Sequence, residues 1–135
     1  MQPQIIYFSK KGNTKKIAEA MATQLKVNAE DVNTATLKKD TFVLLGSGNY
    51  AGNPAKVMTE FISNNDFSKR TVALFGTSGG GVGNEVKIMQ QSLESQGADI
   101  KGTYYCKGKF LVMNRGRPNE DDLKAAQEFA KKMMK

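Results

Sequence analysis

Short, continuously apolar runs alternate with amphipathic helical patterns along this chain. Runs such as "FVLL" and "VALF" are typical of strands that are covered on both faces. We expect strands at residues 4–8, 41–46, 71–76 and 102–105, with a weaker strand near residues 26–30. Because strands that alternate with helices are joined by right-handed crossovers, they form a parallel sheet. The spacing predicts an α/β three-layer fold: a five-stranded, doubly wound parallel sheet of order 2-1-3-4-5 with helices on both faces.

Helical patterns occupy the segments between and after these runs. The first pattern follows Thr14, and the second is predicted to begin at Asn53-Pro54, with Asn53 as its cap. The third is predicted to stop at Gly97. The last is predicted to be capped by Asn119, with the acidic residues 120–122 in its first turn. The 135 residues suit a single domain, which we expect to span residues 1–135.

Composition excludes several classes of function. The chain has no histidine, which removes histidine-based catalytic triads and most zinc sites, so we assign no catalytic residue and no metal ligand. Cys106 is the only cysteine, and it is expected to be a small buried residue in a protein of the reducing cytoplasm. We see neither a secretion signal nor an apolar run long enough to cross a membrane. The net charge of +7 suits an acidic protein partner or a phosphorylated ligand, or serves general solubility. Because the basic residues are scattered and no nucleic-acid motif is present, we expect no nucleic-acid partner.

Three polar, glycine-rich loops follow the first, third and fourth predicted strands. They are "SKKGNT", "GSGNYAGNP" and "GTSGGGVGN". The carboxyl ends of parallel strands meet at one edge of a sheet, and doubly wound sheets bind ligands where the strand order reverses. The three loops are therefore predicted to form one binding site.

The first loop leads directly into a helix, whose N-terminal N–H groups and positive dipole end favour a phosphate. Gly12 permits a tight backbone, Ser9 and Thr14 offer hydroxyls, and nearby lysines add positive potential. The alternative is that Asn13 or Thr14 merely caps the helix.

The other two loops favour a planar ligand. "GSGNYA" fits a dinucleotide pattern only weakly, because it does not follow the first strand or open a helix at once. Tyr50 in this loop is either a ring that stacks on a flat ligand or a surface side chain that covers the loop. The glycines of the third loop let the backbone approach a ligand closely, or make the loop mobile. Together the loops predict a site for a phosphorylated planar heterocycle.

These motifs resemble those of the flavodoxins. The phosphate loop of that family has the form [ST]-x-[ST]-G-x-T, matched here by residues 9–14, and "GSGNYAGNP" and "TSGG" also look familial. The resemblance, from about residue 5 to 132, implies a short-chain, flavodoxin-like fold with noncovalently bound FMN and electron transfer between redox protein partners. By position, Tyr50 would stack on the isoalloxazine, and backbone groups of Gly52 or its neighbours would lie near the flavin N5. The implied cofactor-binding residues are Ser9, Lys10, Lys11, Gly12, Asn13, Thr14, Ser47, Gly48, Asn49, Tyr50, Ala51, Gly52, Thr77, Ser78, Gly79, Gly80 and Gly81.

The sequence departs from the family pattern in three ways. Lys11 replaces the middle hydroxyl of the phosphate loop, and glycines stand where many flavodoxins have a second aromatic residue. Flavodoxins are typically acidic whereas this chain is basic, so we expect a redox partner with an acidic docking face. The cluster Lys107, Lys109, Arg115 and Arg117 is either that docking surface or a solvated face.

Other functions remain open from the sequence. They are a dedicated flavoprotein that feeds one reductase or activates ribonucleotide reductase, a small NAD(P)H-dependent FMN or quinone reductase, and a module that has lost flavin and only binds a protein.

Overall fold

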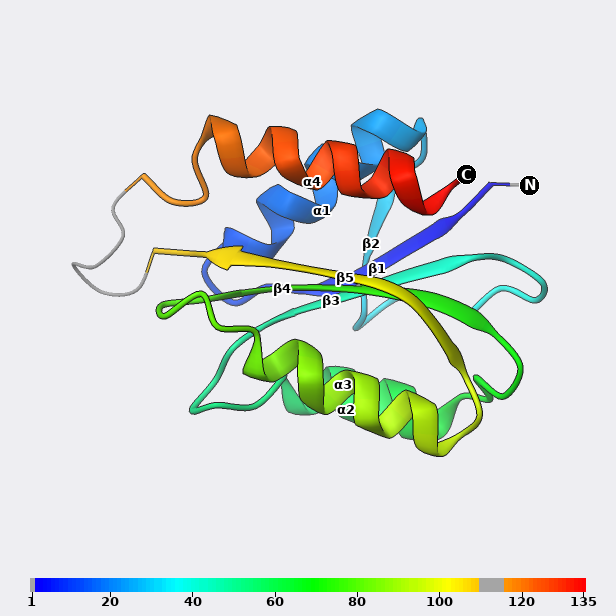
Figure 1. Cartoon of the computed structure of the whole chain (residues 1–135). Coiled ribbons are helices and arrows are strands. Elements are labelled where there is room, and N and C mark those ends of the chain that lie inside the picture. The colour runs from blue at the N-terminus through cyan, green and yellow to red at the C-terminus, as the bar shows by residue number, and fades with distance from the viewer. Residues whose placement is uncertain (1, 110–115) are drawn as a thin grey trace.

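The computed structural model describes residues 2–109 and 116–135, and it contains a five-stranded parallel sheet covered by helices on both faces (Figure 1). The strand order is β2-β1-β3-β4-β5, as the sequence predicts. In chain order the elements are β1 (Gln4–Phe8), α1 (Asn13–Leu25), β2 (Ala29–Asp31), β3 (Val43–Gly48), α2 (Lys56–Asn64), β4 (Thr71–Ser78), α3 (Asn84–Ser95), β5 (Asp99–Lys107) and α4 (Glu120–Met133).

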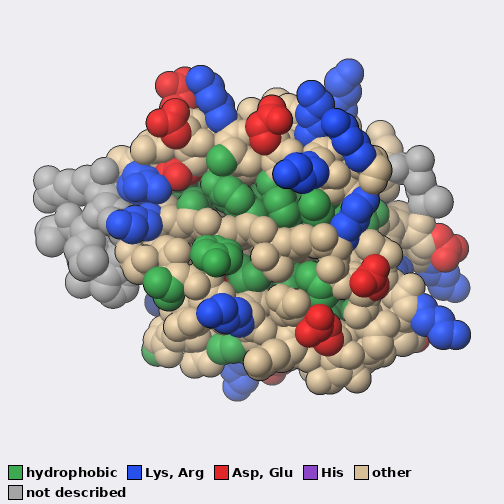
Figure 2. All heavy atoms as spheres, viewed as in Figure 1, with side chains coloured by type: hydrophobic (Ala, Val, Ile, Leu, Met, Phe, Trp, Pro, Cys, Tyr) green, Lys and Arg blue, Asp and Glu red, His purple; other side chains and the backbone are tan. Residues whose placement is uncertain are grey.

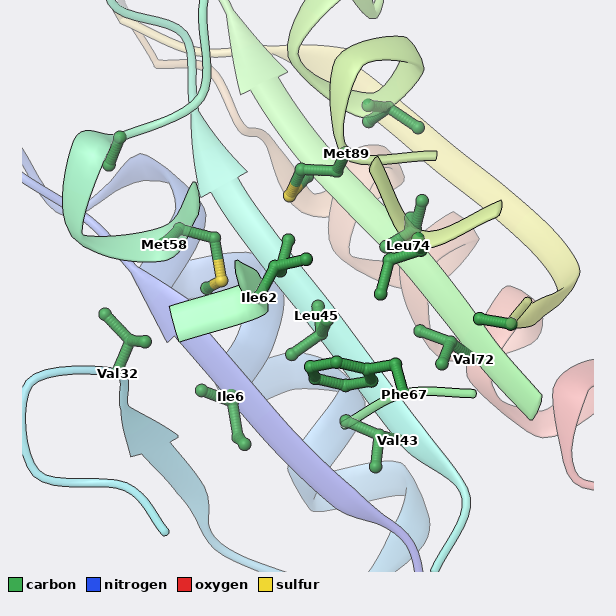
Figure 3. Packing of buried hydrophobic residues seen from close by; sticks show 14 residues of the cluster. Ile6, Val32, Val43, Leu45, Met58, Ile62, Phe67, Val72, Leu74 and Met89 are labelled. Carbon is green, nitrogen blue, oxygen red and sulfur yellow. The ribbon is translucent and has the colours of Figure 1, made fainter. Parts of the chain in front are cut away.

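The sheet separates two hydrophobic clusters. Successive side chains of a strand point to opposite faces, so Leu44 packs against α1 and α4 while Leu45 packs against α2 and α3. Figure 3 shows the cluster that contains Leu45, in which Met58 of α2 and Met89 of α3 point toward the strands. All six residues of β3 are buried, which explains why its sequence reads as a continuous apolar run rather than an alternating one.

Two of the predicted helix ends are confirmed. Gly97 follows α3 with φ +92°, and its N–H donates to the Glu94 carbonyl at 3.0 Å. Asn119 caps α4: its side chain accepts from the Asp122 N–H at 2.9 Å, and the Asp122 carboxylate accepts from the Asn119 N–H at 2.8 Å.

The predicted start of α2 at Asn53-Pro54 is wrong. The helix begins at Lys56, after Ala55, and no side chain caps it. The reason is that Asn53 forms an antiparallel bridge with Tyr50, in which the two residues exchange backbone hydrogen bonds of 2.7 and 3.1 Å. The Ala55 N–H instead donates to the Ser47 hydroxyl at 2.9 Å, so the entrance of the helix is tied to the end of β3.

The predicted strand boundaries shift by a few residues. The weak strand expected at 26–30 is β2, Ala29–Asp31, because Lys26 closes α1 in a left-handed conformation with φ +59°. The strand expected at 102–105 extends over Asp99–Lys107. None of the helices in the described part of the chain combines the length and hydrophobicity that crossing a membrane requires.

Candidate functional site

The three loops meet at the carboxyl edge of the sheet, where they enclose a cavity of about 380 Å³. Its walls are formed by Ser9, Lys10, Lys11, Asn13, Thr14, Gly48, Asn49, Tyr50, Ala51, Thr77, Ser78, Gly79, Gly108 and Lys109. A second cavity of about 390 Å³ shares Asn49, Ala51, Ser78 and Gly79 with the first and extends to Gly52 and Gly80. The structure therefore brings the three predicted loops together.

The first loop presents the N-terminus of α1 to the cavity. Gly12 is the N-cap residue with φ +95°, a left-handed conformation that glycine adopts without strain. No side chain caps the helix, so the alternative that Asn13 or Thr14 is merely a cap is wrong. The Ser9 hydroxyl accepts from the Gly12 N–H at 3.0 Å and shapes the turn. With no acidic residue in its first turn and Lys10 and Lys11 at the cavity, this helix end attracts anions.

Thr14 joins the first loop to the third. Its side chain is buried, and its hydroxyl lies 2.8 Å from the hydroxyl of Thr77 at the end of β4. A hydroxyl has one hydrogen and two lone pairs, so a pair of hydroxyls bonded to each other keeps one hydrogen for a further acceptor. The cavity edge is therefore left with a hydroxyl donor.

Tyr50 in the second loop folds over the site rather than extending into solvent. Its hydroxyl accepts from the Lys10 N–H at 3.1 Å, and its ring meets the edge of Phe8 with the centroids 6.0 Å apart. The ring covers Gly48, where an added Cβ would lie 2.7 Å from the Tyr50 hydroxyl. Burial raises the pKa of the Tyr50 phenol despite the bond from Lys10, so the ring is neutral near pH 7.

The tip of the second loop is a tight turn. Ala51 and Gly52 both have positive φ, +55° and +86°, as in a type I′ turn, between the bridged residues Tyr50 and Asn53. The Asn49 side chain accepts from the Gly52 N–H at 2.8 Å. Backbone groups of this turn lie along the second cavity.

The third loop is held by Ser78, whose hydroxyl accepts from the Gly81 N–H at 2.8 Å. Beyond it lie two exposed apolar side chains, Val82 at 58% exposure and Tyr105 at 42%. Tyr105, from β5, packs against Gly83, where an added Cβ would lie 2.8 Å from the ring. An aromatic residue thus stands beside the glycine loop, which the loop sequence does not reveal.

Residues after β5 form a fourth wall that the sequence interpretation missed. Gly108 and Lys109 line the cavity, and the Asn13 side chain donates to the Lys109 carbonyl at 2.8 Å. An added Cβ at Gly108 would lie 2.8 Å from the Asn13 amide nitrogen, so any other residue there would displace the Asn13 side chain. The topology offered a signal for this wall, because the carboxyl end of β5 belongs to the same sheet edge.

The remaining predicted residues surround the cavity without lining it. Ser47 is buried at the end of β3, and Gly12 is the N-cap residue of α1. Gly52 and Gly80 line the second cavity, and the Gly81 N–H donates to Ser78 in the third loop. Cys106 is buried as predicted, and burial raises the pKa of its thiol to about 11, so it is not a thiolate near pH 7.

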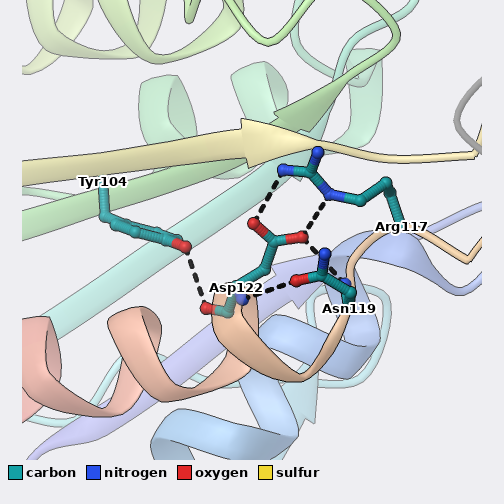
Figure 4. Close-up of polar contacts among 4 residues, drawn as sticks. All are labelled: Tyr104, Arg117, Asn119 and Asp122. Carbon is teal, nitrogen blue, oxygen red and sulfur yellow. Dashed lines mark hydrogen bonds and ion pairs between the residues drawn. The ribbon is translucent and has the colours of Figure 1, made fainter.

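The proposed basic cluster is divided by the structure. Lys107 and Lys109 are exposed, whereas Arg117 donates two hydrogen bonds of 2.6 and 2.8 Å to the Asp122 carboxylate (Figure 4). Arg115 lies outside the described residues. Figure 2 shows Lys and Arg side chains distributed over one face of the molecule, with Asp and Glu between them.

Comparisons with known proteins identify the relatives of this chain. The family model for a flavodoxin domain matches residues 4–114. An uncharacterized protein of Methanocaldococcus jannaschii is 31% identical over an alignment that covers 91% of each chain. Among solved structures, a flavodoxin from the domain Archaea superposes with a TM-score of 0.77 at 19% identity and full coverage of both chains. A flavodoxin of Streptococcus pneumoniae superposes with a TM-score of 0.76 at 18% identity, over 98% of this chain and 97% of the other.

Proposed function

Because the chain belongs to the flavodoxin domain family, we propose that it binds FMN noncovalently and transfers electrons between redox proteins. The observation that carries the proposal is that one cavity is lined both by the loop at the uncapped N-terminus of α1 and by the loop that carries Tyr50. These features match the phosphate and the ring of a flavin mononucleotide.

The phosphate end of the cavity suits a dianion. The N-terminal N–H groups of α1 and the Ser9 hydroxyl would donate hydrogen bonds to phosphate oxygens. The hydroxyl hydrogen that the Thr14–Thr77 pair does not use between its two members would donate a further one. Lys10 and Lys11 would compensate the charge. Since the Lys10 N–H is bonded to the Tyr50 hydroxyl, a phosphate oxygen at that position would compete with Tyr50.

The ring end suits a planar heterocycle. Tyr50 offers a neutral aromatic face, and the two cavities together span the second and third loops. Their volumes of about 380 and 390 Å³ are in the range of ligand pockets. The Ala51–Gly52 turn and the glycines of residues 79–81 would present backbone N–H and C=O groups to the ring edge.

Bound FMN would supply the redox chemistry, and the protein would set its orientation and electrostatic environment. Among the residues that the structure describes, we identify no pocket for a nicotinamide in addition to the proposed flavin site. The basic surface supports a partner with an acidic docking face.

Titration of the purified protein with FMN and with riboflavin, followed by flavin fluorescence, tests the proposal. We expect one FMN per chain with a Kd of about 1 μM or below, and at least about tenfold weaker binding of riboflavin, which lacks the phosphate. A protein that takes up neither flavin would contradict the proposal and favour a flavin-free binding module. Steady NADPH oxidation by the FMN-loaded protein alone would instead favour a reductase.

A further inference from the structure

Glu85, in the first turn of α3, is a completely buried carboxyl group. Its Oε1 accepts from the Asn49 side-chain amide at 3.1 Å. Its Oε2 is buried and has no hydrogen-bond partner among the residues that the structure describes. Native proteins rarely leave a buried polar atom unsatisfied, because its desolvation is not compensated.

The sheet is shaped to admit this carboxyl group. Gly76 in β4 lies directly against it, and an added Cβ at that position would be 2.1 Å from Glu85 Oε2. Any other residue at position 76 would displace the carboxyl group. The absence of a side chain at Gly76 therefore makes the space that the Glu85 carboxyl group occupies.

The hydrogen bond that Glu85 Oε1 accepts leads to the binding site. The Asn49 amide is held at both ends: its nitrogen donates to Glu85, and its oxygen accepts from the Gly52 N–H at 2.8 Å. Asn49 lines both cavities, and Gly52, at the tip of the turn, lines the second. A continuous path of hydrogen bonds thus runs from α3 to the turn.

Burial also shifts the pKa of the carboxyl group. Desolvation raises the pKa of Glu85, although hydrogen bonds from the Asn49 side chain and from the backbone of Glu85 itself oppose the shift. Oε1 remains an acceptor for the Asn49 amide whether or not Oε2 carries a proton.

We propose that Glu85 is a positioning residue that fixes the Asn49–Gly52 turn, through Asn49, in the conformation that receives the ring end of FMN. This inference rests on the proposed function. Protein sites that bind or react often retain locally unfavourable groups, and here the unsatisfied carboxyl group would be retained for the order it imposes on the loop.

Two variants separate positioning from simple packing. Glu85→Gln keeps an acceptor for Asn49, whereas Glu85→Met has a similar linear shape and no such acceptor. We expect Glu85→Met to change the midpoint of thermal unfolding of the FMN-free protein little, because the loss of the unsatisfied Oε2 offsets the loss of the acceptor for Asn49. We expect the same variant to speed amide hydrogen exchange at Gly52 and to weaken FMN binding, each by at least about tenfold. Glu85→Gln should stay within about threefold of the original protein in both measurements.

The Asn49→Ala variant and the Glu85→Met/Asn49→Ala double variant supply an independent check. If the two residues act through one path, their effects on Gly52 exchange are strongly non-additive. Unchanged Gly52 exchange and FMN affinity in Glu85→Met, or additive effects in the double variant, would overturn the inference. If the original protein bound no FMN, the proposed function would fail, while Gly52 exchange in the FMN-free protein would still decide whether Glu85 holds the turn.

Discussion

Lys11 stands where the flavodoxin phosphate loop has its second hydroxyl, and the structure places it on the wall of the cavity. A lysine acts as a mobile point charge, whereas a threonine hydroxyl makes a fixed, short hydrogen bond. The side chain is exposed, so its attraction to a phosphate is screened by salt.

The variant Lys11→Thr replaces the positive charge with the hydroxyl of the family pattern. We expect FMN affinity to fall about two- to fivefold at low ionic strength, and the salt dependence of binding to weaken. Riboflavin affinity should not change, because riboflavin carries no phosphate. Flavin fluorescence titrations at two salt concentrations measure both effects. The matched control is Lys16→Thr, an exposed lysine of α1 that does not line the cavity; an equal loss in both variants would assign Lys11 only to the general basic surface.

At the scale of elements, a network of hydrogen bonds among Tyr104, Arg117, Asn119 and Asp122 holds the start of α4 (Figure 4). The Asp122 carboxylate accepts from the Arg117 guanidinium and from the Asn119 N–H, and the Asp122 carbonyl accepts from the Tyr104 hydroxyl at 2.9 Å. The Arg117 carbonyl also accepts from the Lys109 N–H at 3.0 Å, so the helix start is connected to the fourth wall of the cavity. The cap therefore stabilises both α4 and the cavity.

The capping carboxylate predicts a pH dependence of stability. Burial raises the pKa of Asp122, but the bonds from Arg117 and Asn119 outweigh burial and hold the pKa below its usual value. A group with a lowered pKa stabilises the fold above its unfolded-state pKa of about 3.9, and this contribution is lost as the pH falls through the folded-state pKa.

We expect Asp122→Asn to lower the free energy of unfolding by about 1–2 kcal/mol at pH 7. The difference between the two proteins should shrink below about pH 4, since the original protein then loses its charged cap. Urea denaturation between about pH 3 and 7 measures it. Asp121→Asn, at an exposed neighbour in the same helical turn, is the control. A difference that stays constant with pH would contradict this account.

At the scale of the whole molecule, the chain carries a net charge of +7, and Lys and Arg side chains are spread over the face that Figure 2 shows. Such a charge affects long-range encounter more than the fold, because complementary potentials raise association rates. The exposed lysines Lys107 and Lys109 lie at the cavity edge of the sheet, where they would meet a partner that approaches a bound flavin.

We expect electron exchange with an acidic ferredoxin to slow by at least about tenfold as ionic strength rises from about 0.02 to 0.5 M. Exchange with the basic protein cytochrome c should stay constant or accelerate, since screening then removes repulsion. Stopped-flow measurements on the FMN-loaded protein follow both reactions. If the rate with the acidic protein were independent of salt, steering by the basic surface would be excluded.

Local patterns in the sequence were sufficient for the fold and for the general place of the site. Apolar runs and helical periodicity are properties of neighbouring residues, and right-handed crossovers convert their order into the sheet order 2-1-3-4-5. The caps at Gly97 and Asn119 are equally local, because they depend on residues within one helical turn. The meeting of the three loops then follows from the direction of the parallel strands.

Tertiary structure alone decided the details of the site, because they depend on contacts between residues far apart in the chain. The Tyr50 hydroxyl bonds to the backbone of Lys10, 40 residues away, and the Asn13 side chain bonds to Lys109, 96 residues away. The bond between Glu85 and Asn49 likewise spans 36 residues. No periodicity or local propensity encodes such pairs. The sequence by itself determined which elements form and in what order they pair, and packing at the sheet edge determined which side chains meet.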